Sequence, residues 1–165
     1  MYNGSMNVFL QFKQSSLWGS SVSLEKNFLR ESSLFLGNQY AEVAVEWDDF
    51  KNEAFWSELR RINPSRLYIF DNRFDLRLWV PLIYEKLGPD VAIVCHLFGN
   101  PLERLHSFFS ASEKLKGKKL FFSGGSLAQV NLLKNLLNDP ANVLYLPFIP
   151  DQTVFSEGSS QIMSF

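Results

Sequence analysis

Residues 90–96 read Asp-Val-Ala-Ile-Val-Cys-His, in which an unbroken apolar run of strand length ends at a polar side chain. Similar runs lie at 66–70, 118–122 and 142–146. Strands that are covered on both faces of a parallel sheet are continuously apolar, whereas strands with one solvated face alternate. The four runs therefore predict strands of a parallel sheet.

Segments with helical spacing separate these runs. The apolar stripe at 76–87 ends at Gly88, and Pro81 within it predicts that the regular helix begins only near Val80. Alternating strands and helices predict right-handed crossovers. We expect an α/β fold with a Rossmann-like, doubly wound, mainly parallel sheet of about six strands and helices on both faces.

The last helix has the clearest start signal, because Ser126 followed by Gln129 is a capping-box pattern. The first part of the chain is less regular. There we expect a strand at 7–12, a polar loop at 14–21, a helix at 22–31, a second strand with a loop at 35–47, and a helical stripe at 55–62.

Length and charge narrow the class of protein. With 165 residues we expect one domain at 1–155, followed by an interdomain linker or tail at 156–165. The 16 Lys and Arg nearly balance the 17 Asp and Glu, so no global field favours a nucleic-acid partner, and none is expected.

The cellular setting follows from the cysteine count and the hydropathy pattern. The single cysteine, Cys95, excludes an internal disulfide, and its apolar surroundings predict a buried thiol in a reducing cytoplasm. The N-terminus lacks a cationic segment leading into an apolar one, and no apolar run approaches the ~18 residues of a membrane span. Neither secretion nor membrane spanning is expected.

Ligands of open α/β sheets bind beyond the carboxyl ends of the strands, where loops lead into helices. The candidate substrate-binding residues follow the predicted strands and are Gly19, Ser20, Asp71, Asn72, Gly99, Ser123 and Gly124. Gly19 would let a ligand approach the backbone, although a tight turn into a helix explains it equally well.

His96 follows the run at 91–95 and is the candidate catalytic residue. A neutral imidazole there could accept a proton from a hydroxyl group or hydrogen-bond to it. A structural histidine at the end of a strand is the alternative. His106 is expected on a helix, as a surface or packing residue.

Several other kinds of site are excluded by missing residues. Asp71 at a strand end is typical of phosphorylated receiver domains, but the first strand ends in 12–14, Phe-Lys-Gln, without the acidic pair that binds magnesium. The turn at 123–126 lacks the G-x-S-x-G nucleophile elbow. Phosphate-loop, dinucleotide and metal-ligand spacings are also absent, so no metal and no cofactor are expected.

A basic run follows Phe108 and Phe109. Its members are Lys114, Lys116, Lys118 and Lys119. Lysines beside aromatic rings can dock on anionic lipid headgroups, so peripheral membrane contact is one hypothesis, and a solvated helix end is the other.

The second half of the chain resembles the end of the N-terminal domain of GT-B glycosyltransferases of the family 4-like type (glycosyltransferase group 1). The run at 118–123 ends in serine ahead of a helix, and the strand at 142–146 leads into Pro147, Asp151 and Phe155. These three match the Pro-x-x-x-Asp-x-x-x-Phe segment that precedes the linker in that family.

Two upstream segments extend the resemblance. The segment 63–70 resembles a strand on the acceptor side, and 90–96 resembles the next strand, which commonly ends in histidine in the family. The chain also departs from the pattern. Ser20 stands where a second glycine is common, and Phe-Ile-Pro at 148–150 replaces a frequent asparagine-glycine turn.

The resemblance implies transfer of a sugar from a nucleotide sugar to an acceptor hydroxyl. This chain would hold the acceptor, a glycan or a lipid-linked molecule, with His96 polarising the acceptor or the transferred sugar. The family's nucleotide-sugar site and paired glutamates lie in a C-terminal domain, so the chain alone is expected to be inactive. The alternatives are a subunit of a split glycosyltransferase and a non-catalytic Rossmann-like binding module.

Overall fold

The computed structural model describes residues 5–13, 19–70, 74–97, 102–137 and 140–147, without the side chains of 19–24, 102–104 and 140. Six strands form one sheet in the order β2-β1-β3-β4-β5-β6, and all five strand pairings are parallel. The strands are β1 (Met6–Phe12), β2 (Tyr40–Val45), β3 (Pro64–Ile69), β4 (Ala92–Leu97), β5 (Leu120–Gly124) and β6 (Val143–Tyr145). The predicted parallel sheet is confirmed.

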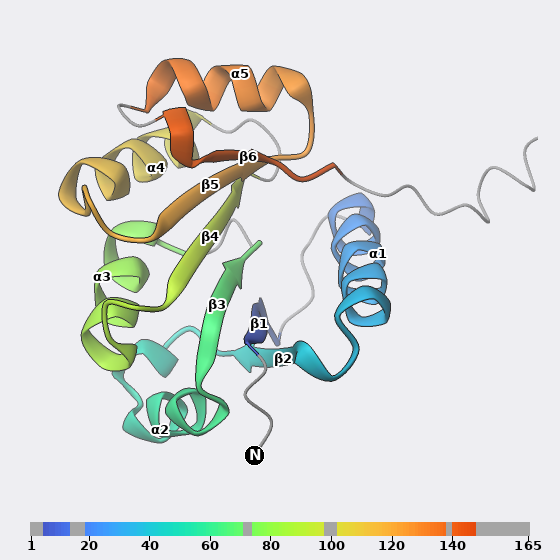
Figure 1. Ribbon diagram of the computed structural model, residues 1–165, viewed down its shortest axis with the longest axis vertical. Coiled ribbons are helices and arrows are strands. Elements are labelled where there is room, and N and C mark those ends of the chain that lie inside the picture. Colours follow the sequence, from blue (N-terminus) through green and yellow to red (C-terminus); the bar gives the residue numbers. More distant parts are fainter. Residues whose placement is uncertain (1–4, 14–18, 71–73, 98–101, 138–139, 148–165) are drawn as a thin grey trace, which may run out of the picture.

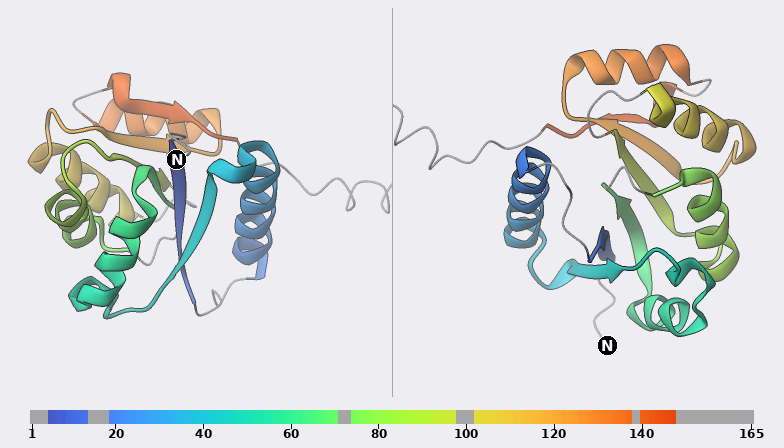
Figure 2. Two further views of the ribbon diagram at one scale, coloured as in Figure 1. Left: turned by 60° about the horizontal axis from the view of Figure 1, so that its bottom comes forward. Right: turned by 180° about the vertical axis from the view of Figure 1, so that it is seen from behind.

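Helices cover both faces of the sheet, as predicted, but unevenly. Within the described residues, α1 (Gly19–Leu36) lies alone on one face, opposite α2 (Glu53–Ile62), α3 (Leu76–Leu87), α4 (Leu102–Lys114) and α5 (Leu127–Leu136) (Figures 1 and 2). From β1 the chain winds to one edge of the sheet, and from β3 onward it winds to the other. This reversal makes the fold doubly wound and places the topological switch point between β1 and β3.

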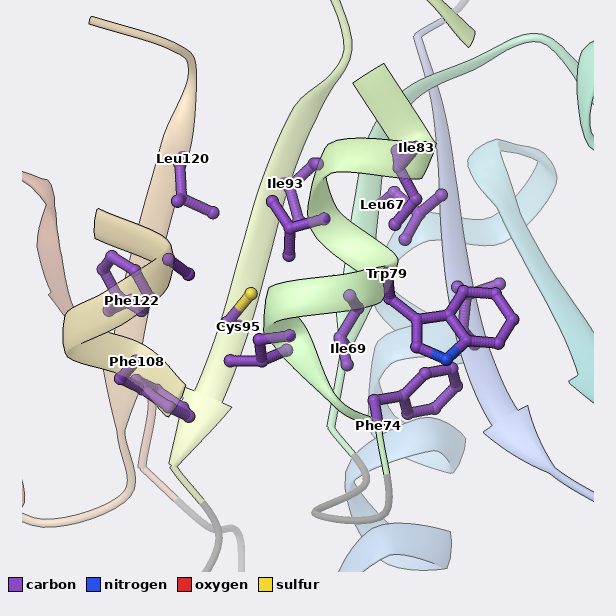
Figure 3. Close-up of a cluster of buried hydrophobic side chains, with 14 of the residues drawn as sticks. Leu67, Ile69, Phe74, Trp79, Ile83, Ile93, Cys95, Phe108, Leu120 and Phe122 are labelled. Atoms are coloured by element: carbon purple, nitrogen blue, oxygen red, sulfur yellow. The ribbon is translucent and has the colours of Figure 1, made fainter. Parts of the chain in front are cut away.

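The larger hydrophobic cluster lies between the sheet and helices α2 to α5. Figure 3 shows part of it, with Cys95 of β4 at the centre, Phe108 and Phe122 on one side, and Phe74 and Trp79 on the other. Cys95 is fully buried, and burial raises the pKa of its thiol, as expected for an inert core cysteine.

A smaller, aromatic cluster lies between the sheet and α1. The rings of Phe9 and Tyr68 stack with centroids 4.4 Å apart, and the ring of Phe28 lies 4.3 Å from that of Phe70. Phe28 belongs to α1 and the other three belong to the sheet or its edge. This cluster therefore attaches α1 to β1 and β3 by aromatic contacts.

The first helix is longer than predicted at both ends. It begins at Gly19, inside the predicted loop at 14–21, and it continues through Leu36, which the prediction assigned to the second strand. Phe35 in its last turn is 89% exposed. An apolar residue that faces solvent at a helix end does not follow the spacing of the buried helix face. The sequence pattern at this end therefore resembled the start of a strand.

The predicted start of α3 near Val80 is wrong, because Asp75 caps the helix one turn earlier. An Asp75 carboxylate oxygen accepts a hydrogen bond from the backbone N–H of Arg77 at 3.0 Å. Pro81 then lies inside the helix, where it lacks the N–H that would have donated to Arg77 and its ring crowds the Arg77 carbonyl. The N-terminal cap and the burial of the apolar stripe stabilise the helix by more than the lost hydrogen bond costs.

The predicted cap of α5 is confirmed. The Ser126 hydroxyl oxygen accepts from the backbone N–H of Gln129 at 3.2 Å. The side chain of Gln129 reaches back and accepts from the N–H of Gly125 at 2.8 Å, one residue before the usual capping-box partner. Hydrogen bonds thus hold both ends of the turn between β5 and α5.

Candidate functional site

Two of the candidate residues form a hydrogen-bonded pair at the carboxyl edge of the sheet. His96 and Ser123 are register partners on the neighbouring strands β4 and β5, each in the penultimate position of its strand. His96 Nδ1 lies 2.9 Å from Ser123 Oγ, although the residues are 27 positions apart in the chain. The parallel register places the two residues side by side, and both side chains point to the face that carries α1.

The His96 ring is held in an apolar environment. It stacks on the ring of Phe70, with centroids 4.8 Å apart and planes 21° apart, and Phe70 in turn packs on Phe28 of α1. His96 is 3% exposed and Ser123 is fully buried. The burial lowers the pKa of His96 from 6.5 to about 4, so the imidazole is neutral at pH 7.

This pKa decides which chemistry the imidazole can do. A general base works best when its pKa lies near the operating pH, and a group with a pKa of about 4 is a weak base at pH 7. The lowered pKa therefore favours hydrogen bonding by a neutral ring over proton abstraction.

Gly124 follows Ser123 at the end of β5 and packs closely against α5. A Cβ atom at this position would lie 2.8 Å from Gln129 Cβ and 3.1 Å from the backbone nitrogen of Val130. The missing side chain thus has a structural reason, which is the close approach of the helix to the strand. A role of Gly124 in substrate binding remains a prediction.

We expect Gly124→Ala to lower the free energy of unfolding by about 1–3 kcal/mol, because the helix backbone must move to accept the methyl group. Urea unfolding followed by circular dichroism measures the change. Asn131→Ala, on an exposed position of the same helix, is the control and should change stability by no more than about 0.5 kcal/mol. Equal effects at the two positions would contradict the close packing.

The remaining candidates fall into two groups. Gly19 and Ser20 occupy the first turn of α1 rather than the predicted loop, at a helix end where backbone N–H groups lack intrahelical partners. Asp71, Asn72 and Gly99 lie outside the described residues. His106 is exposed on α4, so of the two alternatives it is a surface residue.

A hollow at the carboxyl ends of β1 and β2 was not predicted. Its volume is about 330 Å³, and it is lined by Phe12, Lys13, Val45, Glu46, Trp47 and Asp48. The side chain of Trp47 is 54% exposed there. A tryptophan two residues after a strand would have been the signal, but the prediction covered 35–47 as a strand with a loop and did not say where the strand ends.

The basic run lies at the opposite edge of the sheet, where α4 ends and β5 begins. Of the two rings beside it, Phe108 is buried against Phe122, with centroids 5.2 Å apart, and only Phe109 is partly exposed, at 38%. Peripheral membrane contact stays a prediction, now with one aromatic ring rather than two. In the part of the chain that the structure describes, no helix has the length and apolarity that crossing a membrane requires.

Metal binding and similarity to known proteins give no further lead. Among the described side chains, no three His, Cys, Asp or Glu residues come together as a set that could hold a metal ion. Comparisons of the chain with protein-family models, with curated proteins and with solved structures find no match. The functional argument therefore depends on the sequence and on the geometry of the carboxyl edge.

Proposed function

We propose that this chain is the acceptor-side domain of an enzyme that transfers a sugar from a nucleotide sugar to an acceptor hydroxyl. The observation that carries the proposal is the His96–Ser123 pair, which lies at the carboxyl edge of a doubly wound parallel sheet. Open α/β sheets bind their ligands at this edge. The histidine at the end of β4 and the serine at the end of β5 are also the two strand-end residues on which the resemblance to GT-B glycosyltransferases depends.

The neutral state of the imidazole suits glycosyl transfer. The transition state of such a reaction has oxocarbenium character, with positive charge on the transferred sugar. An imidazolium beside it would raise the barrier by repulsion, whereas a neutral imidazole can hydrogen-bond to sugar hydroxyls at no electrostatic cost. Burial in the aromatic environment of Phe70 keeps His96 neutral, and the Ser123 hydroxyl fixes the orientation of the ring.

The deep burial of His96 favours one further candidate function. A histidine that is 3% exposed and bonded to a fully buried serine can serve packing alone. The chain would then be a non-catalytic Rossmann-like binding module, and His96 and Ser123 would matter for stability but not for turnover.

The first test is the mass and activity of the intact gene product. A product of about twice the mass of this chain would contain a second domain of similar size for the donor. The intact product is incubated with UDP-, GDP- and ADP-linked hexoses and candidate acceptors, and release of the nucleoside diphosphate is measured. We expect release with at least one donor.

Variants then assign the role of the pair. His96→Asn should lower kcat by at least about tenfold, because the amide can reach Ser123 but cannot reproduce the second ring nitrogen. Ser123→Ala should lower it less. His106→Asn, the same substitution at an exposed position of α4, is the matched control. No diphosphate release from the wild-type product, or unchanged kcat in His96→Asn, would contradict the proposal.

A further inference from the structure

The hollow beside Trp47 combines an exposed aromatic ring with charged hydrogen-bonding groups. Its volume of about 330 Å³ is at the lower end of the range of small-molecule sites. Large aromatic side chains are mostly buried in folded proteins, yet the Trp47 side chain is 54% exposed at the carboxyl edge of the sheet. The hollow is distinct from the His96–Ser123 pair, because β1 and β2 form it whereas β4 and β5 carry the pair.

The Trp47 ring packs on buried aromatic rings of the core. It packs on Phe12 of β1, with centroids 4.7 Å apart, and Phe12 packs on Phe74 at 4.6 Å. Phe74 contacts Trp79 of α3 at 5.1 Å. These three supporting rings are buried. A chain of aromatic contacts therefore joins the exposed ring to the core.

The loop that carries Trp47 is held by hydrogen bonds. An Asp49 carboxylate oxygen accepts from the backbone N–H of Glu46 at 2.7 Å, and the N–H of Asp49 donates to the carbonyl of Glu46 at 3.2 Å. The N–H of Lys13 donates to the carbonyl of Val45 at 3.0 Å, which continues the pairing of β1 with β2 beyond the strands. A ligand that stacks on Trp47 would thus meet a surface that is already ordered.

The charged groups around the ring carry a small negative surplus. Among the described residues, Glu46 and Asp48 line the hollow and Asp49 accepts from the backbone of Glu46, whereas Lys13 also lines the hollow and Lys51 pairs with Asp48. Three carboxylates against two ammonium groups leave one negative charge. Lys13 Nζ lies 2.7 Å from Glu46 Oε1, and this hydrogen bond is the main cause of the raised pKa of Lys13. The hollow therefore offers both donors and acceptors, but no net attraction for an anion.

We infer that the Trp47 hollow is a saccharide-binding subsite for an uncharged sugar ring. The C–H groups on the apolar face of a pyranose are polarised by the ring oxygens and stack on the negative face of an indole. Lys13 would donate to sugar hydroxyls, and Glu46 and Asp48 would accept from them. The negative surplus disfavours uronic acids and sugar phosphates. The assignment of this sugar as part of the acceptor rests on the proposed function.

The test is direct binding to this chain, without any transfer reaction. Methyl glycosides of glucose, galactose, mannose and N-acetylglucosamine are titrated while the indole N–H signals are followed by NMR, with Trp47→Phe used to assign the Trp47 signal. We expect at least one glycoside to shift that signal saturably. Methyl glucuronide should bind at least about tenfold more weakly than methyl glucoside at low ionic strength.

Two alanine variants show whether the ring carries the binding. The affinity for the glycoside, measured by saturation-transfer NMR, should fall at least about tenfold with Trp47→Ala. It should stay unchanged with Tyr145→Ala, which removes a half-exposed ring from the end of β6. Circular dichroism confirms that both variants fold, and Trp47→Phe provides a milder second variant with intermediate affinity.

Two results would overturn the inference, namely no shift with any glycoside and unchanged binding in Trp47→Ala. In the first case, a shift with tetramethylammonium would make the hollow a cation site. These outcomes are separate from the proposed function. Glycoside binding without diphosphate release by the intact product would retain the subsite and reject the transferase, and the reverse result would do the opposite.

Discussion

Replacing Trp79 with alanine is expected to lower the free energy of unfolding by about 3–5 kcal/mol. The side chain is 3% exposed and lies where α2, α3 and the end of β1 meet. Its ring, which lies beside that of Phe74 in Figure 3, has its centroid 5.1 Å from that of Phe74, 5.9 Å from that of Phe55 and 6.0 Å from that of Trp56. Because these neighbours are large rings held on different elements, they cannot collapse into the space that the indole leaves.

Urea unfolding followed by circular dichroism measures this loss, and Trp47→Ala is the matched control. The control removes the same atoms from a position that is 54% exposed, so it should cost about 1 kcal/mol or less. A domain of this size has a total stability of only about 5–15 kcal/mol, so Trp79→Phe is included as a milder variant that stays folded. Similar losses of unfolding free energy for Trp79→Ala and Trp47→Ala would show that the aromatic contacts of Trp79 do not stabilise the core.

The sequence predicts the sheet well because of the way in which its strands are buried. The run at 91–95 contains side chains that point to both faces, and each face is covered, so the strand is apolar throughout. Hydrophobic periodicity detects this pattern directly. It detects α1 poorly, because that helix alone covers its face and leaves Leu34 and Phe35 in solvent. Periodicity therefore gave no boundary between α1 and β2, and Gly37, whose φ is 52° directly after Leu36, is the helix-stop signal that the prediction did not use.

The candidate site was predicted in part. His96 and Ser123 were chosen independently because each follows an apolar run, but their contact depends on the register between β4 and β5, which no local pattern specifies. Gly124 was chosen as a ligand contact, and the structure supplies a packing reason that only the position of α5 reveals. Trp47 was missed because its exposure depends on where β2 ends.

The buried imidazole of His96 should make the stability of the domain fall as the pH falls from about 7 to 4. In the unfolded chain the imidazole has its ordinary pKa of 6.5, whereas burial lowers the pKa to about 4 in the folded protein. Between these values the unfolded state binds a proton and the folded state does not, so acid favours unfolding. The loss approaches about 3 kcal/mol near pH 4 and does not grow further below it, because the folded state then also takes up the proton.

The pH dependence of urea unfolding between pH 4 and 7 isolates this effect when wild type is compared with His96→Asn. Carboxylates such as Glu53, whose pKa is lowered by its hydrogen bonds to Arg60 and Lys86, affect stability only at the acid end of this range, are common to both proteins and cancel in the difference. We expect the wild type to lose about 3 kcal/mol more than the variant over this range. His106→Asn, the same change on the exposed side of α4, should keep the wild-type slope. Equal slopes in the wild type and His96→Asn would mean that the folded state accepts a proton on His96 readily. The imidazole would then not be held neutral by burial, and the proposed function would lose that support.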